Sequence, residues 1–343
     1  MTLGRRILFL PLALGLLFLL IVVSVGFGSV AVPLDKTWAA LLHGFGLQSG
    51  VPGDDKWDAI IFLVRLPRVL GAALIGAVLA LAGAVMQGIL RNPMADPGII
   101  GISGGASFGA VLAIASGWGA QAWYHLPLAA SLGALLAAGV IFSLTLRQSR
   151  SAITSLILAG MAVSTFLGAG TSLVLSFISR DNLAQFVFWS MGNLANIRWE
   201  SLAGVVLPIL LCLVVLPWFA RDINIMLLGE EQARAVGLEQ SRLRLLLLAL
   251  VALMTALAVS ISGPISFVGL IVPHMVRLVL GPDNRLVMPF SLVAGAIFLV
   301  ACDLLARLAL GGQELFVGVV TALVGAPYFL FLLLDSRRKE ARQ

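Results

Sequence analysis

Ten apolar runs, separated by short polar breaks, make up most of this 343-residue sequence. A helix needs roughly 20 consecutive apolar residues to cross the hydrocarbon core of a bilayer, and the runs are about that long. Their approximate bounds are 7–28, 65–88, 98–116, 127–146, 152–178, 201–220, 242–262, 264–280, 286–308 and 315–335. We therefore predict an all-α polytopic membrane protein with about ten transmembrane helices.

Charged residues make up 11% of the sequence, whereas soluble domains are about 25% charged. No change in composition marks a separate soluble domain, so we expect a single transmembrane domain over residues 1–343. The first run is too long for the core of a cleaved signal peptide, and we interpret it as an uncleaved span. Cys212 and Cys302 lie inside apolar runs, where we expect packing and neither a metal site nor a disulfide.

Membrane topology explains the net charge of +6 better than nucleic-acid binding does, because lysine and arginine gather in cytoplasmic loops. With the N-terminus placed inside, most of the 22 lysines and arginines fall on the inner side. Ten spans return the chain to that side, and both ends of the sequence are basic. We predict that both termini are cytoplasmic.

The third and eighth runs are short, rich in glycine and adjacent to proline, at Pro97–Gly105 and Gly263–Pro273. Short or broken helices are tolerated at membrane depth only where protein or a water-filled cavity covers them. The two halves of the sequence are weakly alike and run in opposite directions through the membrane. An inverted repeat with broken helices is typical of transporters.

The longest inner loop, residues 221–241, has the pattern of a short amphipathic helix between Gly229 and Gly237. Such a loop is either an ordinary solvated linker or a docking helix for a cytoplasmic partner. With five other blocks, it makes the sequence resemble the permease subunits of type II ABC importers, which move cobalamin, heme and iron–siderophore complexes. The blocks are Arg65–Arg68, Gln87 with Arg91–Pro97, Leu228–Leu238, Gly263–His274, Asp303–Arg307 and Glu314–Pro327. Many relatives have proline where this chain has Phe316.

The resemblance implies that Arg65, Arg68 and Arg307 receive acidic residues of an external substrate-binding protein. Arginine stays charged and binds carboxylates in a bidentate manner, and the i, i+3 spacing puts Arg65 and Arg68 on one helix face. The alternative is that these arginines simply reach the membrane interface from the ends of spans.

The resemblance also implies that the 221–241 loop docks on an ATPase subunit, through Gly229, Glu230, Ala233, Gly237 and Leu238. No G-x-x-x-x-G-K-[ST] motif occurs in the sequence, so ATP has to be bound and hydrolysed by a partner. We therefore expect this chain to be neither an enzyme nor the holder of a cofactor.

In the family the permease is a homodimer with a central path. The residues that we expect along this path are Gln87, Ser164, Gly168, Thr171, Ser172, Gly318 and Thr321; tight helix packing is the alternative for the small ones. In the outer segment 179–200, Arg180 or Arg198 could pair with a carboxylate of the ligand and Trp189 could contact a flat ligand. An interfacial aromatic belt is the favoured alternative for the aromatic residues.

The predicted function is the permease subunit of an ATP-driven importer for an iron chelate, heme or ferric siderophore, with cobalamin as the alternative. The predicted partners are a second copy of the chain, two ATPase subunits, an external binding protein and lipid of a bacterial inner membrane, and no nucleic acid. Two rival classes are an intramembrane serine protease using Ser103 and His274, and an ion-coupled carrier. Asp303 lies four residues before Arg307, which predicts a local ion pair.

Overall fold

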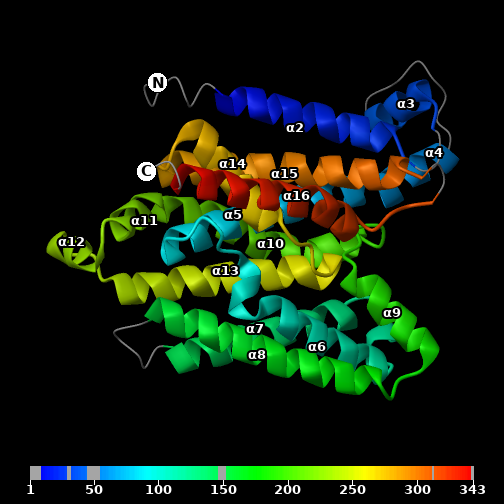
Figure 1. Ribbon diagram of the computed structural model, residues 1–343. Helices are drawn as coiled ribbons and strands as arrows, with labels where there is room; N and C mark the ends of the chain where they lie inside the picture. Colours follow the sequence, from blue (N-terminus) through cyan, green and yellow to red (C-terminus); the bar gives the residue numbers. More distant parts are fainter. Residues whose placement is uncertain (1–8, 29–31, 45–54, 146–151, 311–312, 341–343) are drawn as a thin grey trace.

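The computed structural model describes residues 9–28, 32–44, 55–145, 152–310 and 313–340, and within these ranges the chain is helical with no β-strand. Seven helices are long and apolar enough to cross a membrane: Phe9–Gly26, Lys56–Leu90, His125–Thr145, Thr154–Leu175, Trp199–Leu227, Gln240–Ser262 and Asn284–Leu308. Three shorter apolar helices are Ile102–Ala115, Val268–Leu280 and Val317–Phe331. The helices lie alongside one another (Figure 1), and the predicted polytopic all-α fold is confirmed.

Figure 1 labels the helices as follows: α2 (Phe9–Gly26), α3 (Leu34–Gly44), α4 (Asp55–Ala59), α5 (Leu66–Leu90), α6 (Ile102–Ala115), α7 (His125–Thr145), α8 (Ala152–Leu175), α9 (Arg180–Ser190), α10 (Trp199–Val215), α11 (Ala220–Leu227), α12 (Glu230–Ala235), α13 (Gln240–Ser262), α14 (Val268–Leu280), α15 (Asn284–Leu308) and α16 (Val317–Glu340). The short third and eighth runs form α6 and α14, as predicted. Helices α3 and α9 lie in segments for which no helix was predicted, because both carry charged residues and neither is an apolar run.

Two spans are longer than their apolar runs. The second begins at α4 and passes through a π-helical turn, Ile60–Arg65, before it continues as α5. The sixth continues from α10 through a 3₁₀ turn into α11, where Ile223 and Met226 are buried although Asp222 and Asn224 interrupt the apolar run. An amphipathic helix end keeps one apolar face, which a search for continuous apolar residues does not detect.

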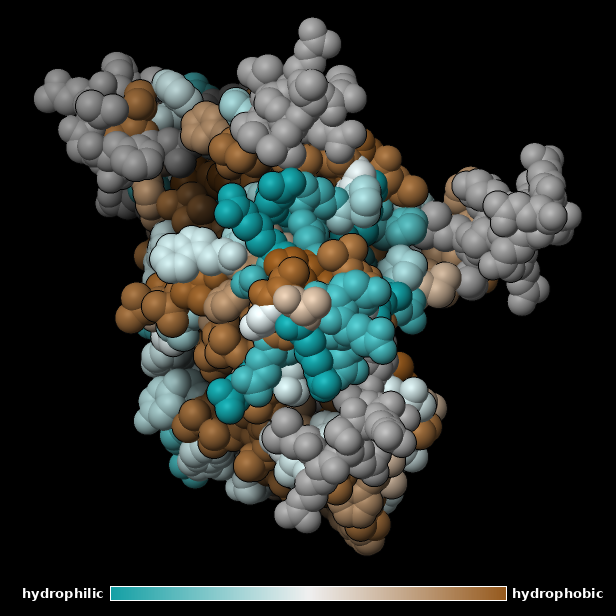
Figure 2. All heavy atoms as spheres, turned by 90° about the vertical axis from the view of Figure 1, so that its left-hand side faces the viewer, coloured by the Kyte–Doolittle hydropathy of each residue, from teal (hydrophilic) through white to brown (hydrophobic). Residues whose placement is uncertain are grey.

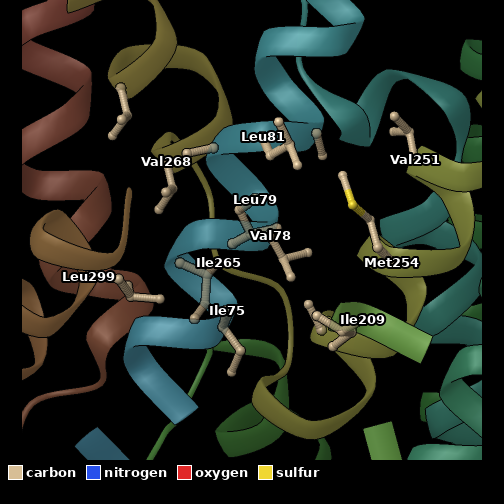
Figure 3. Packing of buried hydrophobic residues seen from close by; sticks show 14 of the residues in the cluster. Ile75, Val78, Leu79, Leu81, Ile209, Val251, Met254, Ile265, Val268 and Leu299 are labelled. Carbon is tan, nitrogen blue, oxygen red and sulfur yellow. The ribbon is translucent and has the colours of Figure 1, made fainter. Parts of the chain in front are cut away.

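Helix α5 forms the centre of the bundle and is the most deeply buried of the seven long helices. Figure 3 shows Ile75, Val78 and Leu79 of this helix among apolar side chains of neighbouring segments. The backbones of α5 and α14 approach so closely that a β-carbon at Gly83 would overlap the carbonyl of Gly269. Small residues permit this close approach, which increases van der Waals contact between helices in a membrane.

The two ends of the bundle differ. Helix α12, the start of α2 and the end of α16 lie at one end, and α3, α4 and α9 lie at the other (Figure 1). Hydrophilic side chains gather on the end that carries α12, around a smaller apolar area (Figure 2). We call these the α12 end and the α9 end. The terminal residues 1–8 and 341–343 lie outside the described residues.

Candidate functional site

The three arginines that were predicted to receive a binding protein lie together at the α9 end, in one buried cluster with Asp303 and Glu314. Arg65, Arg68 and Arg307 are 5%, 5% and 3% exposed, and Asp303 is fully buried. Arg68 Nε donates to Asp303 Oδ1 at 2.9 Å, and Arg307 Nε lies 3.0 Å from Asp303 Oδ2. The predicted Asp303–Arg307 ion pair is therefore confirmed.

Arg65 and Arg307 also hold the end of α2. Arg65 Nη1 donates to the carbonyls of Val25 and Gly26 at 2.9 and 2.7 Å. Arg307 Nη1 donates to the carbonyls of Ser24 and Phe27 at 2.9 and 2.7 Å. The last carbonyls of a helix have no partner within the helix, and a cation is favourable beside them. The cluster thus fastens the first span, which is otherwise largely exposed, to α5 and α15.

The burial of Arg65 and Arg68 bears on the prediction that they dock a binding protein. The two were expected to lie on one helix face, but Arg65 binds backbone carbonyls at the end of α2, whereas Arg68 binds Asp303 and Glu314. Glu314 is the cluster member with the larger exposure: its side chain is 29% exposed, and its Oε2 lies 2.6 Å from Arg68 Nη1. Glu314 thus already supplies a carboxylate to Arg68. Docking of a binding protein by the three arginines stays a prediction.

The second predicted site, the 221–241 loop, contains α12 between two glycines. Gly229 and Gly237 have φ values of 124° and 83°, in the region that favours glycine. Ala233 is fully buried, and its carbonyl accepts a hydrogen bond from the Leu238 amide at 2.9 Å. The start of α12 is tied to α13, because Gln240 Nε2 donates to the Gly229 carbonyl at 3.0 Å.

The outer surface of this loop combines charge and apolar area. Leu228 and Val236 are each 67% exposed beside α12. Glu230 and Arg234 form an exposed ion pair at 3.0 Å. A shallow pocket of about 370 Å³ lies between α12 and α13, lined by Glu230, Arg234, Gly237, Leu238, Glu239, Gln240 and Ser241. An apolar area with a charged rim is typical of a surface that binds another protein.

The residues predicted to line a path are not brought together in the single chain. Gln87 is buried between α5 and α14, where its Nε2 donates to the carbonyls of Gly269 and Leu270 at 3.3 and 3.1 Å. Helices α8 and α16, which carry the other candidates, lie on different sides of the bundle (Figure 1). Gln87 therefore braces α14 inside the protein, and its role beside a path stays a prediction.

The path candidates on α8 and α16 differ in exposure. Gly168 and Ser172 are exposed and Ser164 is half-buried, while Thr171 and Thr321 are buried. The hydroxyls of Thr171, Ser172 and Thr321 donate to carbonyls of their own helices, at 2.9, 3.0 and 3.0 Å. Gly318 instead packs against the segment after α9, since a β-carbon there would overlap the Met191 carbonyl.

The predicted ligand contacts lie at the α9 end. Arg180 and Arg198 are exposed, and Trp189 is half-buried and packs near Phe186. Phe188 of α9 stacks on Phe316, with ring centroids 5.7 Å apart. These aromatic contacts fit an interfacial belt as well as a ligand mouth, so the ligand role stays a prediction.

Comparison with known proteins decides the family. A model of the FecCD transport family matches residues 16–335. The chain belongs to this family. It is 42% identical over 317 residues to the cobalamin import system permease protein of Halobacterium salinarum, covering 91% of this chain and 84% of the relative. It is 37% identical to the hemin transport system permease protein of Yersinia pestis, covering 96% and 97%.

A solved structure agrees with this assignment. The FecCD chain superposes with a TM-score of 0.82 on an inward-facing metal-chelate type ABC transporter, at 34% identity, covering 95% of this chain and 98% of that one. The protein is an ABC importer permease of FecCD type, and such permeases are not themselves the catalytic ATPase. The protease and ion-coupled carrier alternatives lose their support, and the structure records no hydrogen bond between Ser103 and His274, both of which it describes.

Sequence reasoning missed one group of polar residues in this FecCD permease. Arg277, Asn284 and Asn224 meet near the α12 end, where Arg277 Nη2 and Asn224 Oδ1 both bind the Asn284 side chain. One signal was present in the sequence: Arg277 interrupts an apolar run, and a charge inside such a run is a functional candidate by default.

Proposed function

We propose that this FecCD permease forms the membrane path of an ATP-driven importer for a metal chelate. It receives the chelate from an external binding protein, and two separate subunits at the α12 end hydrolyse ATP. The surface around α12 is the observation that supports the ATPase contact, because exposed Leu228 and Val236 stand beside charged residues on the hydrophilic end. On this proposal the α12 end and both termini face the cytoplasm of a cell with an inner membrane.

The second copy of the chain covers α8. This helix is only 11% buried in the single chain, and its exposed residues include Thr165, Gly168 and Ser172. Small and polar residues are favoured where transmembrane helices meet or line a cavity. Lipid tails offer a polar side chain no hydrogen-bond partner. The exposed apolar side chains of α2, such as Leu12 and Phe18, are suited to contact lipid.

Cysteine cross-linking tests the dimer. Ser172→Cys places a thiol on the exposed face of α8, and the two native cysteines are buried and free, so their background is low. We expect oxidation to give a covalent dimer in membranes. A matched cysteine on the lipid-facing side, Leu12→Cys, gives none. Equal cross-linking at both positions would remove the dimer surface from the proposal.

The cargo is a metal chelate of the class that the relatives transport. Permeases named for cobalamin and for hemin are both similar over nearly their whole length, at 42% and 37% identity. Iron chelates therefore remain the proposed cargo, and cobalamin stands beside them as a second candidate that the 42% identical relative favours. A permease that passes its cargo along has no need of metal ligands of its own.

The decisive experiment reconstitutes the chain with its ATPase and binding protein in proteoliposomes. Uptake of heme, a ferric siderophore and cobalamin is then measured with and without ATP. We expect uptake of one of these chelates, and only with ATP. Uptake that an ion gradient drives without ATP would overturn the proposal, and so would ATP-dependent uptake of none of the three.

A further inference from the structure

A network of polar side chains joins three segments near the α12 end. Arg277, in the last turn of α14, uses each of its guanidinium nitrogens. Its Nε donates to Gln87 Oε1 at 3.4 Å, and its Nη2 donates to the Ala84 carbonyl and to Asn284 Oδ1, both at 3.1 Å. Its Nη1 donates to the Pro282 carbonyl at 3.3 Å. One side chain therefore links α14 to α5 and to the first residue of α15.

Asn224 extends the network to α11. Its Oδ1 accepts from the backbone amide and the side-chain amide of Asn284, at 3.0 and 2.8 Å. Its Nδ2 donates to Asp283 Oδ1 at 2.7 Å. Asn284 is fully buried and binds both Asn224 and Arg277. Each donor and acceptor of the Asn224 amide group thus points to the turn between α14 and α15, apart from one N–H.

Helix α11 leads directly into α12. The last residue of α11 is Leu227, and α12 begins at Glu230. A further bond ties this segment to α5, because Arg91 Nη2 donates to the Met226 carbonyl at 2.5 Å. A displacement of α12 therefore acts within a few residues on Asn224, and through Asn284 on Arg277.

We propose that Asn224 and Arg277 are positioning residues that transmit movement of α12 to α14 and α5. The inference rests on the proposed ATPase contact at α12. Hydrogen bonds are directional, so a network of this kind holds α11, α14 and α5 in a fixed relation, whereas apolar contacts alone permit sliding. Helix α14 is short and begins inside the bundle beside Gly83, so its movement reaches the membrane interior.

Two substitutions separate transmission from folding. Asn224→Ala removes three hydrogen bonds that link α11 to the α14–α15 turn. Arg277→Lys keeps the charge but replaces a planar group with several fixed donors by one ammonium. Matched controls are Asn92→Ala, whose side chain accepts from the Met94 amide within its own turn, and Arg242→Lys, an arginine whose exposed side chain pairs with Glu239.

The measurement is uptake per ATP hydrolysed in the reconstituted complex, with heme, a ferric siderophore and cobalamin as the cargoes offered. We expect both variants to assemble and to hydrolyse ATP within about twofold of the unmodified chain, while uptake per ATP falls about tenfold, within the range of allosteric coupling. Asn284→Ala combined with Asn224→Ala lowers the ratio no further than either alone, because the two residues follow one another on the same route from α11 to Arg277.

Four outcomes decide the matter. An unchanged ratio in both variants overturns the inference, and so does an equal fall of uptake and hydrolysis in proportion to the amount of assembled complex. If Asn224→Ala does not fold, as judged by its thermal unfolding midpoint, Arg277→Lys decides alone. If the unmodified chain shows no ATP-dependent uptake, the proposed function itself is overturned. If the unmodified chain takes up cargo and both variants keep the same ratio of uptake to ATP hydrolysed, only the inference is overturned.

Discussion

Arg68 and Asp303 form a buried ion pair, with Nε and Oδ1 2.9 Å apart, although 235 positions separate them in the sequence. The Asp303 carboxylate also lies 3.0 Å from Arg307 Nε. One carboxylate thus faces guanidinium groups on α5 and α15. All three side chains are buried. Buried charges of this kind depend on one another, because an unpaired charge in the interior is costly.

Removal of the Asp303 charge should therefore destabilise the fold strongly. We expect Asp303→Asn to lower the free energy of unfolding by about 3–5 kcal/mol, since two buried guanidinium groups lose their counter-charge. Unfolding in detergent micelles, followed by helical circular dichroism, measures the change. The control is Glu239→Gln, which removes the exposed Arg242–Glu239 pair at 3.1 Å and should cost less than about 1 kcal/mol. Equal effects of the two substitutions would contradict the buried pair.

Glu314 should compete with an external carboxylate for Arg68. Its Oε2 lies 2.6 Å from Arg68 Nη1. On the proposed docking role of the arginines, Glu314→Gln removes a charged competitor, and we expect the binding protein to bind the reconstituted permease about tenfold more tightly, which corresponds to 1.4 kcal/mol. Surface plasmon resonance on nanodiscs gives the dissociation constant. A matched substitution at the same end is Glu200→Gln in α10, which should leave the affinity unchanged. Weaker binding of Glu314→Gln would refute the competition.

The helices of this protein could largely be predicted from the sequence, because the bilayer imposes a simple length requirement on apolar runs. Both short helices, α6 and α14, were found where glycine and proline shortened the runs. The extension of the sixth span into α11 could not be predicted in this way, because Asp222 and Asn224 end the apolar run while Ile223 and Met226 keep a buried face.

The surroundings of the candidate residues were harder to predict. The Asp303–Arg307 pair was predictable, because four residues on one helix bring side chains together. Gln87 was expected beside a path, but it contacts the backbone of α14, 182 positions away. Burial of Arg65 likewise depends on the end of α2, which no local pattern connects to it. Such contacts between distant segments exist only in the tertiary fold.

The close approach of α5 and α14 should be intolerant of a single methyl group. A β-carbon at Gly83 would overlap the Gly269 carbonyl, a backbone atom that no rotamer change can remove. We expect Gly83→Ala to destabilise the protein by about 1–3 kcal/mol, the usual cost of overpacking.

Gly139 of α7 is the control, because no atom lies within 4 Å of an added β-carbon there. Gly139→Ala should be neutral or stabilising by up to about 1 kcal/mol, because alanine is the better helix former. Thermal unfolding of both variants in one detergent makes the comparison, and a neutral Gly83→Ala would show that the helices can separate freely.

Asp283, in the turn between α14 and α15, should give the protein a stability term that is lost in acid. Hydrogen bonds from the Arg285 side chain, with others from the Asn224 side chain and the Arg285 amide, lower the pKa of Asp283 from 3.8 to about 2. A group whose pKa is lower in the folded state stabilises the fold above its unfolded pKa, and this contribution disappears as the pH falls through the folded pKa.

We therefore expect the unfolding midpoint of the unmodified chain to exceed that of Asp283→Asn at pH 5, and the difference to shrink between pH 4 and pH 2. Arg285→Gln removes the largest cause of the shift, so it should raise the pKa of Asp283 and abolish most of the same pH dependence. A difference that stays constant from pH 5 to pH 2 would mean that the Asp283 carboxylate does not stabilise this turn through its charge.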